Sequence, residues 1–125
     1  MKKAVLSQNA PKPIGPYSQA VQAGNFLFVS GQLAIDPKDG KLIVENIKLQ
    51  TRLVMENIKA ILEAADFSLK DIVQSNVYLS SMSLFEEFNR EYAKFFECDF
   101  PARATVGIEL KPGALVEVSV VAYKD

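Results

Sequence analysis

Apolar and polar residues alternate along several short segments of this chain, which is the pattern of half-buried β-strands. In the first third, residues 17–22 and 26–30 form two such segments, and the glycine-containing turn between them predicts a hairpin. Two further apolar segments, 33–35 and 42–44, flank a turn that contains proline and glycine. The chain is therefore predicted to begin with two hairpins.

From about residue 46 the apolar residues recur every three or four positions, which predicts helices. The first helix is amphipathic, with charged residues between the members of an apolar stripe: Val54, Ile58, Ile61, Leu62 and Ala65. Ser83 and Glu86 have the spacing of a capping box, which predicts that a second helix begins at Ser83. An aromatic stripe follows and is expected to pack against a sheet: Phe85, Phe88, Tyr92, Phe95 and Phe96.

Three more strands are predicted at residues 72–79, 102–108 and 115–123. Alternation in the first of these is expected to place three apolar residues on one face: Val73, Val77 and Leu79. Strands interleaved with two helices predict an α/β (α+β) fold, in which a mixed sheet has both helices on one face. The last strand is apolar on both sides, so the second face of the sheet is expected to be buried in an oligomer.

Composition limits the classes of function. A length of 125 residues predicts a single domain, 1–125. A formal net charge of -1 with three widely spaced arginines provides no basic surface for nucleic acid. No apolar run has the length of a signal peptide or a membrane span, so we expect a cytoplasmic protein. The chain has no histidine, which excludes histidine triads and histidine metal ligands, and its single cysteine, Cys98, is interpreted as a plain thiol.

Two charged residues in apolar strands are candidates for chemistry. Alternation places Arg103 and Thr105 on the same face of their strand. Lysines outnumber arginines in this chain, so an arginine here suggests a need for the planar fork that binds carboxylates, although composition alone favours an intramolecular ion pair. Glu117 lies within an apolar strand, where burial would raise its pKa for proton transfer, or it is the partner of Arg103.

Two glycine-containing segments are candidates for ligand contact. In 15–18 and 30–32 a small residue stands beside a polar one at the edge of a strand, where backbone N–H groups can face a ligand. The alternative is that each glycine only permits a turn. The pattern by itself leaves both interpretations open.

Several segments together resemble the RidA family, also called the YjgF family, of reactive intermediate deaminases. The similarity runs across nearly the whole chain and is carried by residues 9–11, 14–20, 29–32, 56–62, 101–105 and 114–118. Several motifs in a consistent order are far more specific than any one of them.

The resemblance implies a chorismate-mutase-like α/β fold and a homotrimer whose sheets face a central barrel, with ligand clefts between subunits. It also implies hydrolysis of reactive 2-imino acids and enamines, such as 2-iminobutanoate and 2-iminopropanoate, to 2-keto acids and ammonia, without a metal or organic cofactor. By position, Arg103 is expected to bind the substrate carboxylate and Glu117 the hydrolytic water. Tyr17, Ser30 and Gly31 are expected to line the cleft.

Two positions depart from the family pattern. Thr105 stands where many members have cysteine; its hydroxyl can bind substrate by hydrogen bonds, but it is a poor substitute for a thiolate. Ser119 stands where a second acidic residue is frequent. Two other functions stay open. One is a sensor that binds small carboxylates in the same cleft without hydrolysis, and the other is RNA cleavage, against which the near-neutral charge and missing histidines argue.

Overall fold

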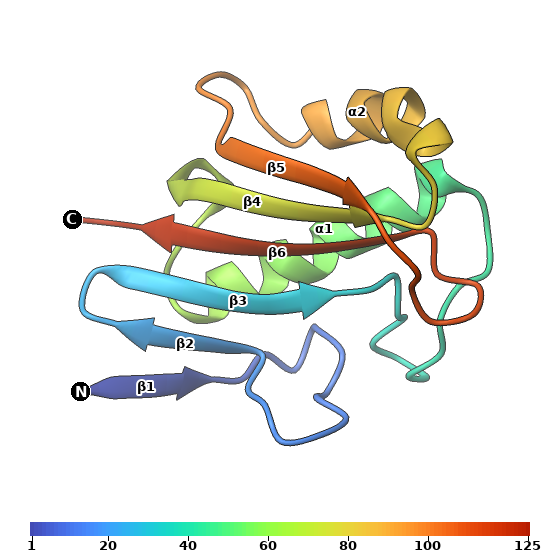
Figure 1. The fold of residues 1–125 in the computed structure, drawn as a ribbon. Helices are drawn as coiled ribbons and strands as arrows, with labels where there is room; N and C mark the ends of the chain where they lie inside the picture. Colours follow the sequence, from blue (N-terminus) through green and yellow to red (C-terminus); the bar gives the residue numbers. More distant parts are fainter.

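The computed structural model describes residues 1–125 as one six-stranded sheet with two α-helices (Figure 1). The strands are β1 Lys2–Val5, β2 Ala20–Ala23, β3 Phe26–Gln32, β4 Ile72–Leu79, β5 Ala102–Gly107 and β6 Val116–Tyr123. The helices are α1 Ile47–Ala64 and α2 Phe85–Ala93, with short 3-10 turns at Leu69–Asp71 and Met82–Leu84. None of these helices is both long and apolar enough to cross a membrane.

The sheet is mixed. Its order is β1-β2-β3-β6-β4-β5, and only the β4–β5 pair is parallel. A parallel pair needs a crossover connection, and α2 lies within the one that joins β4 to β5 (Figure 1). Both helices pack on one face, as the α+β prediction requires, and β5 forms an edge beside α2.

The core lies between α1 and the covered face of the sheet. Along β6 every second residue is almost completely buried: Val116, Val118, Val120 and Ala122. They join the apolar stripe of α1 in a single cluster of 22 buried residues. Burying each of the valine, leucine and isoleucine side chains in this cluster stabilises the fold by roughly 1.5–3 kcal/mol.

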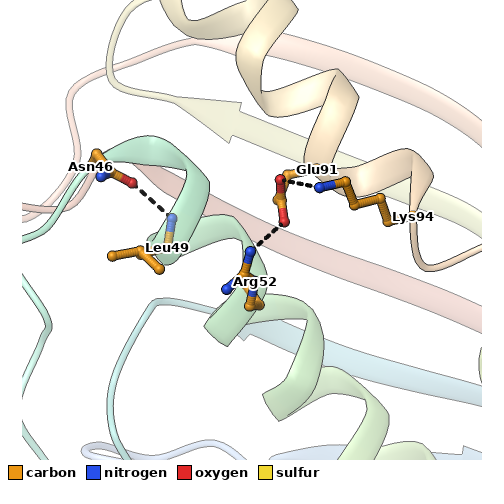
Figure 2. Close-up of polar contacts among 5 residues, drawn as sticks. All are labelled: Asn46, Leu49, Arg52, Glu91 and Lys94. Carbon is orange, nitrogen blue, oxygen red and sulfur yellow. Dashed lines mark hydrogen bonds and ion pairs between the residues drawn. The ribbon is translucent and has the colours of Figure 1, made fainter.

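The helix starts follow the sequence pattern in one case and not in the other. Asn46 caps α1, because its side-chain Oδ1 accepts from the Leu49 N–H at 3.0 Å (Figure 2). The prediction that Ser83 begins the second helix is wrong. The Ser81 hydroxyl accepts from the Ser83 N–H at 3.2 Å, so a 3-10 turn starts earlier and α2 itself begins at Phe85.

Several strand limits also differ from the prediction. The strand expected at 17–22 begins only at Ala20, and the edge strand β1 was not predicted because its two lysines break the apolar alternation. The second predicted hairpin is reduced to one bridge, Ile35 to Leu42. Val73 does not share a face with Val77, since the register shifts between Ile72 and Gln74 and leaves Val73 exposed.

Candidate functional site

Arg103 lies on the edge strand β5 and faces the helices. Its register partner on β4 is Ser75, and Thr105 pairs with Val77 in the same way. Because Ser75 and Val77 are buried on the helix-covered face, Arg103 and Thr105 point to that face as well. Both side chains are half-buried.

The Arg103 guanidinium is surrounded by aromatic rings of α2. Its Cζ atom lies 5.1 Å from the ring centroid of Tyr92, 5.6 Å from that of Phe88 and 5.7 Å from that of Phe85. Both ion pairs of the chain involve Glu91, and the Arg103 guanidinium has no hydrogen-bonding partner. An intramolecular ion pair therefore does not explain Arg103, whose charge is left available for an anion.

A cavity of about 290 Å³ opens beside this guanidinium. It is formed by α2 and the segment before β5, with Asn89, Tyr92, Ala93, Phe100, Pro101 and Arg103 as its lining. The Oδ1 atom of Asn89 is buried and accepts no hydrogen bond. A buried amide oxygen without a donor is costly, so a ligand N–H in this cavity would satisfy it.

Sequence reasoning missed Asn89. The available signal was its position, next to Phe88 and three residues before Tyr92, at the border of the aromatic stripe. A lone amide at such a border is normally a surface residue, and only the fold shows that this one faces the cavity.

Glu117 lies on the opposite face of the sheet. Its neighbours Val116 and Val118 on β6 are buried under α1, so Glu117 points to the face that no helix covers. Burial raises the pKa of the Glu117 carboxyl above its ordinary value, and the charge of Lys111 partly opposes that rise. Glu117 forms no ion pair, and a carboxylate with a raised pKa is suited to accept a proton near neutral pH.

Gly31 makes room for this carboxylate. A Cβ atom at position 31 would lie 3.0 Å from the Glu117 Cδ atom and 3.2 Å from its Cγ atom, and it would overlap Oε2. Gly31 also lies where the register of β3 against β6 shifts. The glycine is therefore required for the observed position of Glu117, not merely to permit a turn.

Ser30 connects Glu117's side of the sheet to the loop that carries Tyr17. The Ser30 hydroxyl donates to the Ser18 carbonyl at 2.7 Å, and the Ser30 N–H donates to the Gln19 carbonyl at 2.9 Å. The buried Gln19 side chain in turn accepts from the Ser7 N–H and donates to the Pro11 carbonyl. These bonds fix the loop, while Tyr17 itself stays exposed.

The predicted site residues thus fall into two groups that one chain does not bring together. The first, which we call the guanidinium half-site, contains Arg103 and Thr105, and the structure adds Asn89 to it. The second, the carboxylate half-site, contains Ser30, Gly31 and Glu117, with Tyr17 on the attached loop.

Register gives the separation of the two half-sites. Glu117 is level with Tyr78 on β4, which is level with Val106 on β5, three residues beyond Arg103. Two strand spacings and three residue rises place the Cα atoms of Arg103 and Glu117 roughly 14 Å apart, with side chains on opposite faces. The sequence-based option that they form an ion pair within one chain is wrong.

The face that carries Glu117 is apolar and uncovered. Phe26, Phe28 and Tyr123 are 43%, 48% and 38% exposed, and Val106 on β5 faces the same side. The rings of Phe26 and Tyr123 meet edge to face at 5.0 Å. So much exposed aromatic surface on one sheet face is typical of an interface.

A larger cavity lies elsewhere and contains none of the predicted site residues. Its volume is about 520 Å³, and it lies between the end of α1 and the segment that follows α2. Cys98 lines it, is exposed, and has the Asp99 carboxylate 3.8 Å from its sulfur.

Comparison with known sequences gives a consistent result. A family profile described as Endoribonuclease L-PSP matches residues 7–124. A RutC family protein of Pyrococcus horikoshii is 52% identical over 126 residues, which cover 100% of each chain. A protein of Dermatophagoides farinae named 2-iminobutanoate/2-iminopropanoate deaminase is 36% identical over 118 residues, which cover 94% of this chain and 92% of that protein.

Solved structures agree in fold over the whole length. RidA from an Antarctic Psychrobacter matches with a TM-score of 0.93 at 41% identity, covering 98% of this chain and 99% of that chain. TdcF of E. coli with bound serine matches with a TM-score of 0.93 at 33% identity, again covering 98% and 99%. These matches confirm the resemblance read from the sequence motifs and the α+β architecture predicted with it.

Proposed function

Because the chain belongs to the family described as endoribonuclease L-PSP, which includes the RidA proteins, we propose that it hydrolyses 2-imino acids and their enamine tautomers to 2-keto acids and ammonia. The observation that carries this proposal is the unpaired guanidinium of Arg103 beside a cavity. One relative is named as a deaminase of 2-iminobutanoate and 2-iminopropanoate, and TdcF binds serine, an amino acid with a similar carboxylate.

Arg103 binds the substrate carboxylate in this proposal. Its fork can donate two parallel hydrogen bonds to the two carboxylate oxygens. No internal ion pair has to break first, since Arg103 has none. The Oδ1 atom of Asn89 accepts from the substrate nitrogen, and Thr105 offers a hydroxyl on the same face of β5.

Glu117 acts on water. Its carboxylate takes a proton from the water as the oxygen attacks the imine carbon, and the C=N double bond becomes a C–N single bond. Glu117 returns this proton to the nitrogen, which gives a carbinolamine with C–OH and C–NH2 groups. Glu117 then carries the proton of the C–OH group to the nitrogen, the C–N bond breaks, and ammonia leaves as the C=O bond forms. The raised pKa of Glu117 supports these transfers, and the chemistry needs no metal or organic cofactor.

A complete cleft requires two copies of the chain, because the half-sites lie on opposite faces of one sheet. We infer a homotrimer of single-domain subunits in which the uncovered sheet faces form the interface. The guanidinium half-site of one subunit then meets Tyr17, Ser30, Gly31 and Glu117 of the next. The exposed rings of the uncovered face support this arrangement, which sizing in solution will test.

An ammonia-release assay tests the activity. Imines are generated in place by an amino-acid oxidase, and the purified chain is expected to accelerate ammonia release and the appearance of the 2-keto acid. The alternative function is a regulatory module that binds small carboxylates. Binding of 2-oxobutanoate in calorimetry, with no acceleration of imine hydrolysis, would favour that alternative and reject the deaminase.

Mixed assemblies test the shared cleft. Arg103→Ala and Glu117→Gln subunits are each expected to be nearly inactive alone, yet each retains the half-site that the other lacks. After reassembly from equal amounts, one cleft in four joins two intact halves, so activity should recover to about a quarter of the wild-type value. Each variant carried alone through the same reassembly is the control. Activity that stays at the level of the separate variants would show that the cleft is not shared.

A further inference from the structure

One buried hydrogen bond links the sheet to the aromatic ring nearest Arg103. The Tyr92 hydroxyl on α2 donates to the Ser75 Oγ atom on β4 at 2.8 Å. Ser75 is completely buried and Tyr92 is 4% exposed, so water does not compete for this bond. Ser75 is also the register partner of Arg103 on β5.

Arg103 depends on these rings for its position. Its side chain has no ion pair or hydrogen bond within the chain, and its Cζ atom lies closest to the Tyr92 ring, at 5.1 Å. We propose that Ser75 is a positioning residue for Arg103 and acts through the Tyr92 ring. Its hydroxyl fixes the far end of the ring, which fixes the surface over which the guanidinium lies.

A structural explanation makes a different prediction. Two buried hydroxyls that bond to each other also satisfy each other, and removing one leaves the other unpaired at a cost in stability. Removing both hydroxyls leaves no buried polar group unpaired. If the bond is merely structural, the double substitution should therefore have little effect. If the bond positions the ring, the double substitution should still displace the Tyr92 ring, because the bond that holds the ring is absent in the single and the double variants alike.

The arginine side chains provide a direct measurement that needs no ligand. The chain has three arginines, so its spectrum contains three Nε–Hε signals, and only Arg103 lies over aromatic rings. Its signals are expected to be shifted by ring currents, with Arg52 and Arg90 as internal references. Ser75→Ala and Tyr92→Phe should move the Arg103 signals toward those of the exposed arginines. Ser75→Thr, which keeps the hydroxyl, should not.

The double variant Ser75→Ala/Tyr92→Phe separates the two explanations. We expect it to regain most of the thermal stability lost in the single variants, while its Arg103 signals stay displaced. Recovery of both the stability and the wild-type signals would overturn the proposal. Unchanged Arg103 signals in Ser75→Ala would overturn it as well.

Measuring KM and kcat adds a second test of the role of Ser75, and this test rests on the proposed deaminase function. Loss of the bond should raise KM for the imine about threefold to tenfold, the range expected for one hydrogen bond, with kcat changed less than twofold. Arg52→Met is the matched control, because it weakens the contact of α2 with α1 on another side and should leave KM unchanged. A wild-type chain without turnover would reject the deaminase, while the arginine signals and the Kd for 2-oxobutanoate would still decide the role of Ser75.

Discussion

The molecule contains two sets of charged residues that differ in whether each charge has a partner within the chain. Arg52 on α1 and Lys94 after α2 both contact Glu91, at 3.0 Å and 3.2 Å, and the three charges form one cluster between the helices (Figure 2). Arg103 and Glu117 lie on opposite faces of the sheet and have no charged partner. The first set is complete within one chain, and the second is not.

The pKa directions of the two glutamates show what this difference means. Burial raises the pKa of Glu91, but the hydrogen bonds and charges of Arg52 and Lys94 outweigh it, so the net pKa is lowered. Burial also raises the pKa of Glu117, and the charge of Lys111 only reduces that rise. A satisfied carboxylate stays ionised and holds helices together, whereas an unsatisfied one retains the capacity to exchange a proton.

Removing Arg103 should give the largest change in activity. In the proposed mechanism, Arg103→Ala removes two charge-assisted hydrogen bonds to the substrate, so we expect kcat/KM for imine hydrolysis to fall by about two to four decades. Stability should change little, because no ion pair is lost. Thermal unfolding and the ammonia-release assay measure the two effects.

Two control variants sharpen the result for Arg103. Arg103→Lys keeps the charge without the fork and should recover only part of the activity. Arg90→Ala removes an exposed arginine of α2 and should be silent. Wild-type activity in Arg103→Ala would mean that Arg103 does not bind the substrate and, like Arg52, has only a structural role.

Replacing Glu117 should affect turnover more than binding. Glu117→Gln removes the proton acceptor and is expected to lower kcat by about two to three decades, with the Kd for 2-oxobutanoate nearly unchanged. The folded pKa of Glu117 is raised, so its contribution to stability is lost as the pH rises through that pKa. The Gln variant should therefore be at least as stable as wild type at neutral pH. Unchanged turnover would remove Glu117 from the mechanism.

Much of the fold follows from local patterns. Helix α1 and strand β6 each bury one face, and the apolar residues on that face recur with the period of a helix or a strand. The errors arise where backbone details decide, as in the register shift beside Val73 and the 3-10 turn that replaces a cap at Ser83. Those details depend on hydrogen bonds between particular residues, and the apolar pattern does not show which residues form them.

The candidate site was predictable only as separate residues. Alternation placed Arg103 and Thr105 on one face, the apolar strand and the glycine motif indicated Glu117 and Gly31, and the resemblance added only their roles. That Arg103 and Glu117 face opposite sides follows from strand order and register together, because β4 lies between β5 and β6 and Glu117 is level with Val106, three residues from Arg103. Periodicity within one strand carries no information on that order.

Gly31→Ala tests the carboxylate half-site through shape alone. The added Cβ overlaps the Glu117 carboxylate, which is the end of a flexible side chain and should swing away. A base that is displaced by about 1 Å is expected to lower kcat by roughly tenfold to a hundredfold. Gly107→Ala is the matched control, since its Cβ meets only Met82, whose side-chain Cγ atom would be nearest at 3.1 Å. Equal effects of the two substitutions would contradict the link between Gly31 and Glu117.

Glu91→Gln should have the smallest effect on activity and a clear effect on stability. The folded pKa of Glu91 is lowered, so its ionised form stabilises the chain above its unfolded pKa, and this contribution is lost as the pH falls through the folded pKa. Arg52 and Lys94 are about half-exposed, which limits the loss at neutral pH to about 1 kcal/mol.

Thermal unfolding as a function of pH measures this contribution. The Tm curves of wild type and Glu91→Gln should differ at neutral pH and converge on acidification, while kcat/KM below the unfolding temperature changes less than twofold. A decade of lost activity would mean that the paired cluster also serves the cleft, because α2 carries both Glu91 and the rings around Arg103. The distinction between satisfied and unsatisfied charges would then no longer separate structure from function in this chain.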